Sequence, residues 1–246
     1  MILALLLGCA DFLTIAETLE DLTNPMVVQA WYLGLEPLPD GVDLSDSGWG
    51  SGSSVRVMLA DATSFDQLEQ APIDDAAVEL EVDGAGYSLL PESDGQFVAT
   101  SEDGLPWAAD ADTVLRVDRD GSHQLAMVTP EAPDVDLPET IEAGDDLGVS
   151  VEGQDYDNVM VTVVRLADGQ TTYDSLPTDI AELYRLTHAS GSLDVEIPGS
   201  AFREPGAYAV GVAGLINADP DDYEGVNLAL SALTAGSLRF VPMRVE

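Results

Sequence analysis

Short runs in which apolar and polar residues alternate recur along this chain, and they predict β-strands that bury one face. In the first half these runs span 55–59, 77–82, 87–90, 96–100, 113–117 and 123–128, after a Val-, Trp- and Tyr-rich strand at 26–35. Asp-Gly pairs separate several of them and lie at 83–84, 94–95, 103–104 and 120–121. Because Asp-Gly between such runs is typical of tight hairpins, the pattern predicts antiparallel sheets.

The second half of the chain repeats this pattern. Strand-like runs span 147–151, 159–166, 192–197, 209–213 and 237–245, and Asp168-Gly169 is a further hairpin turn. The stretch 159–164 is almost continuously apolar, as expected of a central sandwich strand. Helical spacing of apolar residues predicts a short helix from Asp11 to Leu22 and another over 178–188, and 226–233 is a helical turn or a loop.

A Pro- and acid-rich stretch near the middle predicts a linker between two domains. We therefore expect an all-β chain of two tandem antiparallel β-sandwiches, with a short N-terminal helix and one or two short helical segments in the second domain. The expected division is a signal segment at 1–8, an anchor and short helix at 9–25, sandwiches at 26–130 and 146–246, and a linker at 131–145.

Two stretches resemble known sandwich families. The order Ala77-Val78-Glu79-Leu80, Asp94-Gly95-Gln96-Phe97, then Val114 to Val117, resembles the transthyretin-like modules of the carboxypeptidase-regulatory type, which are usually non-catalytic. The stretch 192–214, with Glu204-Pro205-Gly206-Ala207-Tyr208, resembles the corner between strands E and F of immunoglobulin-like sandwiches. That resemblance implies that Tyr208 is a corner tyrosine whose hydroxyl bonds back to the turn.

The chain begins with an apolar run that ends in its only cysteine, as Leu6-Leu7-Gly8-Cys9. These four residues resemble the lipobox of bacterial lipoproteins, which implies that 1–8 is removed and that Cys9 takes a diacylglyceryl group. The resemblance also implies export, and Ala10 in place of Asp favours the outer membrane of a Gram-negative-type bacterium. Signal peptides carry basic residues before their apolar run, and none precedes this run. We therefore expect the true translation start to lie upstream. The alternative is a buried apolar segment with an inert thiol.

The chain is strongly acidic, with 46 Asp and Glu against 8 basic residues and a formal net charge of −38. All of the basic residues are Arg, so a Schiff-base lysine and a P-loop lysine are excluded. Phosphate backbones repel such a surface, which makes nucleic acid a poor partner. Two explanations for the acidity remain open: solvation, as in a salty habitat, and calcium binding.

The residues suited to metal or acid–base chemistry are sparse apart from carboxylates. His123 and His188 are isolated in the sequence and are typical of surface histidines, and structural zinc sites require Cys and His clusters. Calcium takes several oxygen ligands, and Asp219, Asp221, Asp222 and Glu224 form the densest candidate set. Shorter fragments lie at 118–121 and 155–158, and solvated loops are the alternative for each.

Two tryptophans, Trp49 and Trp107, fall on predicted loops, where they are candidate partner contacts or pack locally. The sequence thus predicts a lipid-anchored, non-catalytic binding or structural module that engages an envelope protein or polymer, with no cofactor apart from Ca²⁺ as an open option. A calcium-dependent adhesion or carbohydrate-binding module is the alternative, and a hydrolase with an unidentified site is the second alternative. A pocket that holds a histidine beside Ser and Asp would favour the hydrolase.

Overall fold

The computed structural model describes residues 24–44, 52–68, 70–175, 184, 186–188 and 193–246, and within them the chain is nearly all β. The longest sheet, called the shared sheet, has the order β13-β12-β15-β17-β1-β2-β6-β5, with β10 beside β17. Its strands are β1 (Met26–Leu35), β2 (Ser53–Asp61), β5 (Leu90–Pro91), β6 (Gln96–Thr100), β10 (Thr140–Ile141), β12 (Asn158–Arg165), β13 (Gln170–Asp174), β15 (Gly206–Asn217) and β17 (Ala232–Val245).

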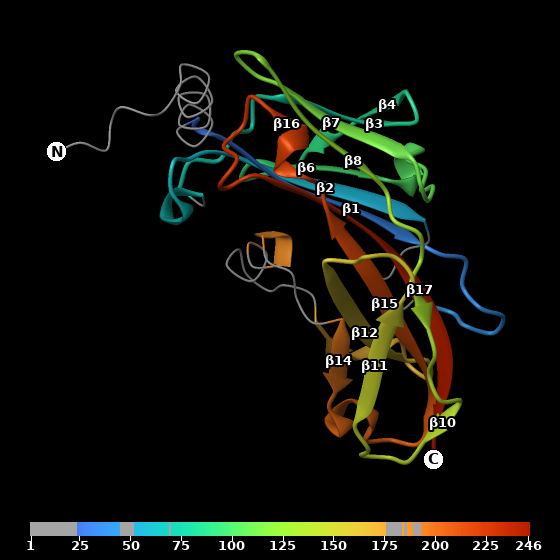
Figure 1. Cartoon of the computed structure of the whole chain (residues 1–246). Helices are drawn as coiled ribbons and strands as arrows, with labels where there is room; N and C mark the ends of the chain where they lie inside the picture. Colours follow the sequence, from blue (N-terminus) through green and yellow to red (C-terminus); the bar gives the residue numbers. More distant parts are fainter. Residues whose placement is uncertain (1–23, 45–51, 69, 176–183, 185, 189–192) are drawn as a thin grey trace, which may run out of the picture.

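Two smaller sheets cover the shared sheet and divide the molecule into two lobes (Figure 1). The first lobe is closed by β16-β8-β7-β3-β4, and the second by β14-β11-β9. The strands are β3 (Ala77–Val82), β4 (Ala85–Ser88), β7 (Asp112–Asp118), β8 (Ser122–Val128), β16 (Tyr223–Glu224), β9 (Asp134–Val135), β11 (Leu147–Glu152) and β14 (Asp194–Ile197). Short 3-10 turns are η1 (Phe65–Gln67), η2 (Ser101–Asp103), η3 (Gly199–Phe202) and η4 (Pro220–Asp222).

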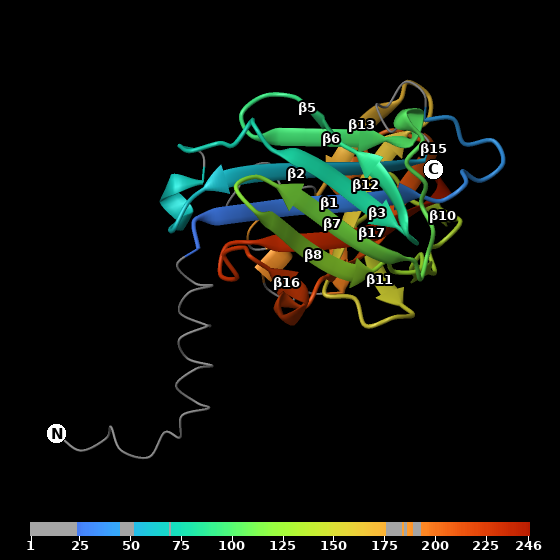
Figure 2. The same ribbon diagram turned by 90° about the horizontal axis from the view of Figure 1, so that it is seen from above.

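Strand β17 belongs to both lobes. Its first part pairs in parallel with β1, from Gln29↔Ala232 to Leu35↔Leu238, while residues 234–245 pair antiparallel with β15. Figure 2 shows β3, β7 and β8 lying over β1, β2 and β17 in the first lobe. At about 3.3 Å per residue, a strand of this length is long enough to cross from one sandwich into the next.

Alternation along β17 places its side chains in three separate apolar clusters. Leu233 and Ala235 enter the core of the first lobe, and Met243 and Val245 enter the core of the second. Phe240 points to the opposite face of the sheet, where it packs in a third cluster with Trp31, Met160 and Leu44. Both faces of the shared sheet therefore carry buried apolar side chains at this strand, which explains why buried residues occur at both sets of alternate positions.

The all-β fold class expected from the sequence is confirmed, because the described residues form mostly antiparallel sheets packed as β-sandwiches. The domain division differs from the expected one. Tyr223 and Val226, together with Leu233, come from the second half of the chain but lie in the first core. The stretch 131–145 carries β9 and β10 and so forms part of the second lobe. Turn and linker composition is local and carries no information on pairing between distant strands, so it does not reveal that the two halves share a sheet.

Most of the predicted Asp-Gly turns connect neighbouring strands. Asp83-Gly84 joins β3 to β4 with a positive φ at both residues, as a type I′ turn requires. Asp103-Gly104 is the exception, because it ends η2 instead of a hairpin. There the Asp103 carboxylate accepts the Thr100 backbone N–H at 2.9 Å in a capping box, with Gly104 in the left-handed region.

The predicted helices fall largely outside the described residues, including the one at 11–22. Of the expected helix at 178–188, Tyr184 and Leu186 to His188 are described, and they are helical. The stretch before β17 is a turn, and β17 begins at Ala232, earlier than the predicted strand. Within the described residues, no helix has the length and apolarity needed to cross a membrane.

A candidate binding cleft where the lobes meet

A cleft of about 380 Å³ opens where the chain passes from β15 in the second lobe to β16 in the first. We call it the junction cleft. It is lined by Asp157, Thr187, His188, Asn217, Ala218, Asp219, Pro220, Tyr223, Leu228 and Ser231. Ligand sites often lie between domains, and this volume falls in the range of small-molecule pockets.

Backbone and side-chain hydrogen bonds hold the base of the cleft. Asn217, the last residue of β15, donates its N–H to Asp157 Oδ2 at 2.8 Å and accepts from Thr234 Oγ1 at 2.6 Å. The Tyr223 hydroxyl donates to the Ala218 carbonyl at 3.2 Å and accepts the Leu233 N–H at 3.1 Å. Burial raises the pKa of Tyr223 to about 12, so this hydroxyl stays protonated and serves as a structural link.

His188 lies at one side of the cleft, on the short helix. Its ring stacks on Tyr184 with centroids 3.9 Å apart, and its Nδ1 lies 2.8 Å from Thr187 Oγ1 and 3.0 Å from the Tyr184 carbonyl. Partial desolvation of the ring lowers the pKa of His188, which favours the neutral imidazole at neutral pH.

The cleft brings together a histidine, a serine and carboxylates, which is the combination that would favour a hydrolase. Their contacts are not those of a catalytic triad. The Ser231 hydroxyl accepts the Val28 N–H at 3.1 Å, and His188 Nδ1 contacts a hydroxyl and a carbonyl in place of a carboxylate. A triad needs the imidazole bonded to the serine on one side and to a carboxylate on the other.

The predicted calcium ligands do not form a joint site. Asp219 accepts the Asp221 N–H at 3.0 Å and caps η4, which also contains Asp222, while Glu224 is exposed on β16. Across the described residues, no group of three or more His, Cys, Asp or Glu side chains could hold a metal ion. The acidic residues here belong to a short turn. Asp219 caps it, Pro220 begins it, and Asp221 and Asp222 lie in its first turn, where carboxylates are favoured without any metal.

Trp107 lies on a loop, as predicted, but it is half-buried and packs at the edge of the first core. Its ring centroid is 4.9 Å from that of Tyr32, and its Nε1 is buried without a hydrogen-bond partner among the described residues. The ring rests against Gly34 of β1, where any Cβ would overlap it. Trp107 therefore packs locally, which is the alternative given for it, and its role as a partner contact stays a prediction. Trp49 and Cys9 lie outside the described residues.

Tyr208 makes the contact that the immunoglobulin-like resemblance implies. Its hydroxyl donates to the Glu204 carbonyl at 2.9 Å, four residues upstream, and its ring is buried in the second core against Phe202. The corner is thus held by one bond from a side chain that also contributes to the core.

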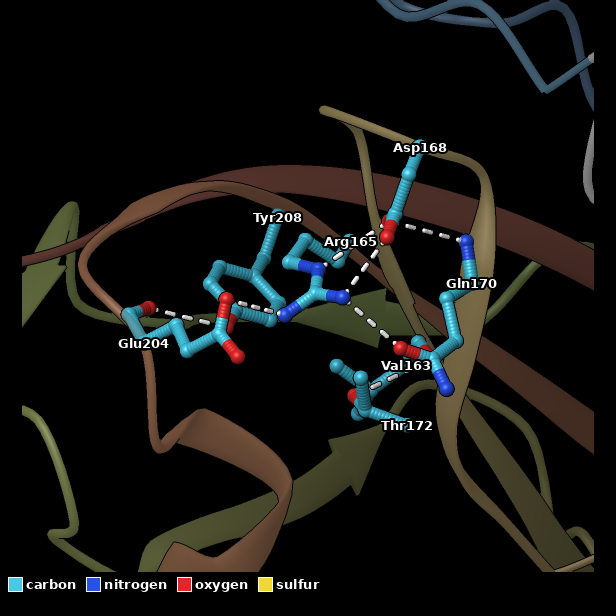
Figure 3. A network of polar contacts seen from close by, with 7 residues as sticks. All are labelled: Val163, Arg165, Asp168, Gln170, Thr172, Glu204 and Tyr208. Atoms are coloured by element: carbon cyan, nitrogen blue, oxygen red, sulfur yellow. Dashed lines mark hydrogen bonds and ion pairs between the residues drawn. The ribbon is translucent and has the colours of Figure 1, made fainter.

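A network around Arg165 ties this corner to the β12–β13 hairpin (Figure 3). The guanidinium binds Asp168 through two bonds of 3.0 and 2.6 Å and contacts Glu204 at 2.6 Å, and it also donates to Gln170 at 2.7 Å. Its hydrogen bond with Arg165 lowers the pKa of Asp168. These bonds join the β12–β13 hairpin to the corner before β15, so the network is a structural clamp.

The sequence pointed to only part of the cleft. Asp219 was a predicted ligand, and Asp157 belonged to one of the weaker acidic fragments, but Asn217 and Ser231 carried no signal. They reach the cleft through pairing between distant strands. One local feature points to the cleft: the Asp219-Pro220 turn that follows the end of the long strand β15.

Comparisons with known proteins add little. No protein-family model matches the chain, and no curated protein matches it. Among solved structures, the chain is similar to the two tandem V-type regions of VCBP3, a v-region-containing chitin-binding protein, at 11% identity over 88% of this chain and 99% of that one. The TM-score is 0.19, which is too low to support an argument about fold or ligand.

Proposed function

We propose that this chain is an exported, lipid-anchored, non-catalytic binding module. Acyl chains on Cys9 hold it at a bacterial outer membrane, and its two lobes present the junction cleft. The observation that carries the binding role is the cleft itself, which has ligand-like volume and a mixed polar lining at the meeting point of two lobes. The lobes share a sheet, so the walls of the cleft are held on a common frame.

The anchoring rests on the sequence Leu6-Leu7-Gly8-Cys9 and on charge. A net charge of −38 is repelled by anionic headgroups, so the acyl chains and not the protein surface would make the membrane contact. Each buried CH₂ contributes about 0.8 kcal/mol, and two or three chains therefore hold a soluble body firmly.

Intact mass of the protein purified from its native membrane tests the anchoring. We expect a mature chain that begins at Cys9 and carries the added mass of two or three acyl chains. A Cys9→Ala variant, expressed in parallel, should lose this mass and leave the membrane fraction. A native protein that keeps Met1 and a free thiol in the soluble cell interior would overturn the anchoring.

A pull-down from native membrane extract tests the wider binding role. We expect a stoichiometric envelope protein or polymer to be recovered with the wild-type chain. Repeated recovery of the chain alone would contradict engagement of such a macromolecular partner.

A further inference from the structure

His123 connects two distant parts of the chain through both nitrogens of its ring. The residue is half-buried on β8, the strand that pairs with β16 (Figure 2). Its Nδ1 lies 2.5 Å from the Gly225 carbonyl oxygen, and its Nε2 lies 3.1 Å from the Arg119 carbonyl oxygen. The ring therefore joins the turn between β7 and β8 to the segment that follows β16.

These two contacts define which protonation state of the ring satisfies them. A backbone carbonyl oxygen only accepts hydrogen bonds, so a ring nitrogen must carry a proton to bond with it. Neutral imidazole has one N–H, whereas the imidazolium has two. Only the charged ring can therefore donate to Gly225 and to Arg119 at the same time. Loss of one proton turns a ring lone pair toward a carbonyl oxygen, and one of the two attractive contacts becomes repulsive.

The backbone at Gly225 allows the ring to approach closely. Its φ of +72° lies in the left-handed region, and a Cβ at this position would come within 2.8 Å of His123 Nδ1. Glycine avoids both the strain and the overlap. The same carbonyl oxygen also accepts from Asn24 Nδ2 at 2.7 Å, so donors from β8 and from the start of β1 meet on it. Gly225 is therefore the point at which both elements hold the chain after β16.

The segment that begins at Gly225 forms one wall of the junction cleft. Leu228 and Ser231 belong to this segment and line the cleft. Asn227 ties the segment to the first strand, because its N–H donates to the Met26 carbonyl at 2.7 Å. A change in the contact between His123 and the segment therefore acts on the cleft wall and on the start of β1.

The other groups around His123 keep their charge in the range where histidine titrates. Histidine changes its charge between about pH 5 and 8, carboxyl groups do so at about pH 4, and arginine stays charged. Arg119 Nε pairs with Asp75 at 3.0 Å, and burial raises the pKa of Tyr223 to about 12. The acidic side chains on β7 and its turn, on η4 and its cap, and on β16 are Asp118, Asp120, Asp219, Asp221, Asp222 and Glu224. Strand β1 and the first part of β17, residues 232–238, carry no charged side chain.

We propose that His123 is a proton-dependent latch that holds the segment 225–231 against the turn between β7 and β8. The charged ring makes both bonds and closes the latch, and the neutral ring can make only one. The latch is therefore closed at low pH and opens as pH rises and the ring loses its proton. Opening loosens one wall of the junction cleft while both cores stay packed. The latch is independent of the proposed anchoring and of any ligand in the cleft.

Hydrogen exchange of single amides in the full chain tests the latch. The Asn227 N–H reports on the segment, because it is bonded to the Met26 carbonyl. Between about pH 5.5 and 8.5 we expect its protection factor, corrected for the intrinsic effect of pH, to fall at least threefold. The midpoint should coincide with the titration of the His123 ring followed by NMR, and the Val210 amide in the second core should stay protected. A constant protection factor at Asn227, or a midpoint that differs from the ring titration, would overturn the proposal.

Two matched variants assign the pH response to one histidine. His123→Gln keeps an N–H donor but does not titrate, so the protection of Asn227 should no longer depend on pH. His188→Gln removes the other histidine of the chain and should keep the wild-type fall. Near-ultraviolet circular dichroism checks that both variants fold, and the midpoint comparison in the wild type decides alone if His123→Gln does not. An equal pH response in the wild type and in folded His123→Gln would contradict the latch.

Discussion

At the scale of single residues, side chains that are conspicuous in the sequence hold the fold together instead of facing a partner. Trp107 covers a glycine of β1, Tyr208 closes a corner, and Arg165 clamps two loops. Tyr208 could be placed from sequence because its role follows from a local motif. The position of Trp107 could not, because it depends on a glycine that is distant in the sequence.

Gly34→Ala should displace the Trp107 indole, because the new Cβ would overlap the ring. We expect a loss of about 1–3 kcal/mol in the free energy of unfolding, as for other overpacked sites. Urea unfolding followed by tryptophan fluorescence measures it. Gly148→Ala is the matched control, since a Cβ there meets nothing within 4 Å. Equal stability of the two variants would contradict the close packing.

The Arg165–Asp168 pair should make stability depend on pH in a defined direction. The folded-state pKa of Asp168 is lowered, so its contribution is present above the ordinary carboxyl pKa and is lost as pH falls through the folded-state value. We expect Asp168→Asn to lower the urea midpoint at pH 7, and the difference from wild type to shrink below about pH 4. Asp136→Asn, an exposed control, should show no such trend. A constant difference across this range would argue against the pair.

At the scale of elements, the strands and most hairpins were predictable because alternation and Asp-Gly turns are local signals. β2, β3, β6, β7, β8, β11 and β12 lie close to where the pattern put them. The sequence does not predict the pairing of β17 with β1 or of β16 with β8. Both pairings join residues about a hundred or more positions apart, which local patterns do not reveal. The cleft depends on both pairings, so its residues could not be grouped from sequence.

Tyr208→Phe should loosen the turn between η3 and β15, because it removes the bond to the Glu204 carbonyl and keeps the buried ring. The expected cost is about 0.5–1.5 kcal/mol, the usual net value of one hydrogen bond. Chemical denaturation at neutral pH measures it, with hydrogen exchange of the β15 amides as a local readout. Unchanged stability and exchange would mean that the ring alone holds the corner.

At the scale of the whole molecule, the shared sheet makes the two lobes dependent on each other. The core of the first lobe needs Leu233 and Ala235, which come from the last strand of the chain. Removal of the second half would also leave β1 without its neighbour β17. The molecule is therefore one folding unit with two cores.

A fragment that ends at residue 130 should fail to fold, and the full chain should unfold in a single transition. Calorimetry and near-ultraviolet circular dichroism measure both. The physical reason is that no cut separates the cores without leaving an exposed edge and an incomplete core. Two resolved transitions in the full chain, or a cooperative transition in the fragment, would show that the lobes are independent.

The parallel pairing of β1 and β17 has a mechanical consequence. A protein held at its N-terminal end and loaded at its C-terminal end is pulled at the start of β1 and at the end of β17. Tension then slides the two strands past each other, so the hydrogen bonds between 29–35 and 232–238 resist together instead of opening one by one. Under the anchoring proposed at Cys9, the strand that joins the lobes would also bear the load.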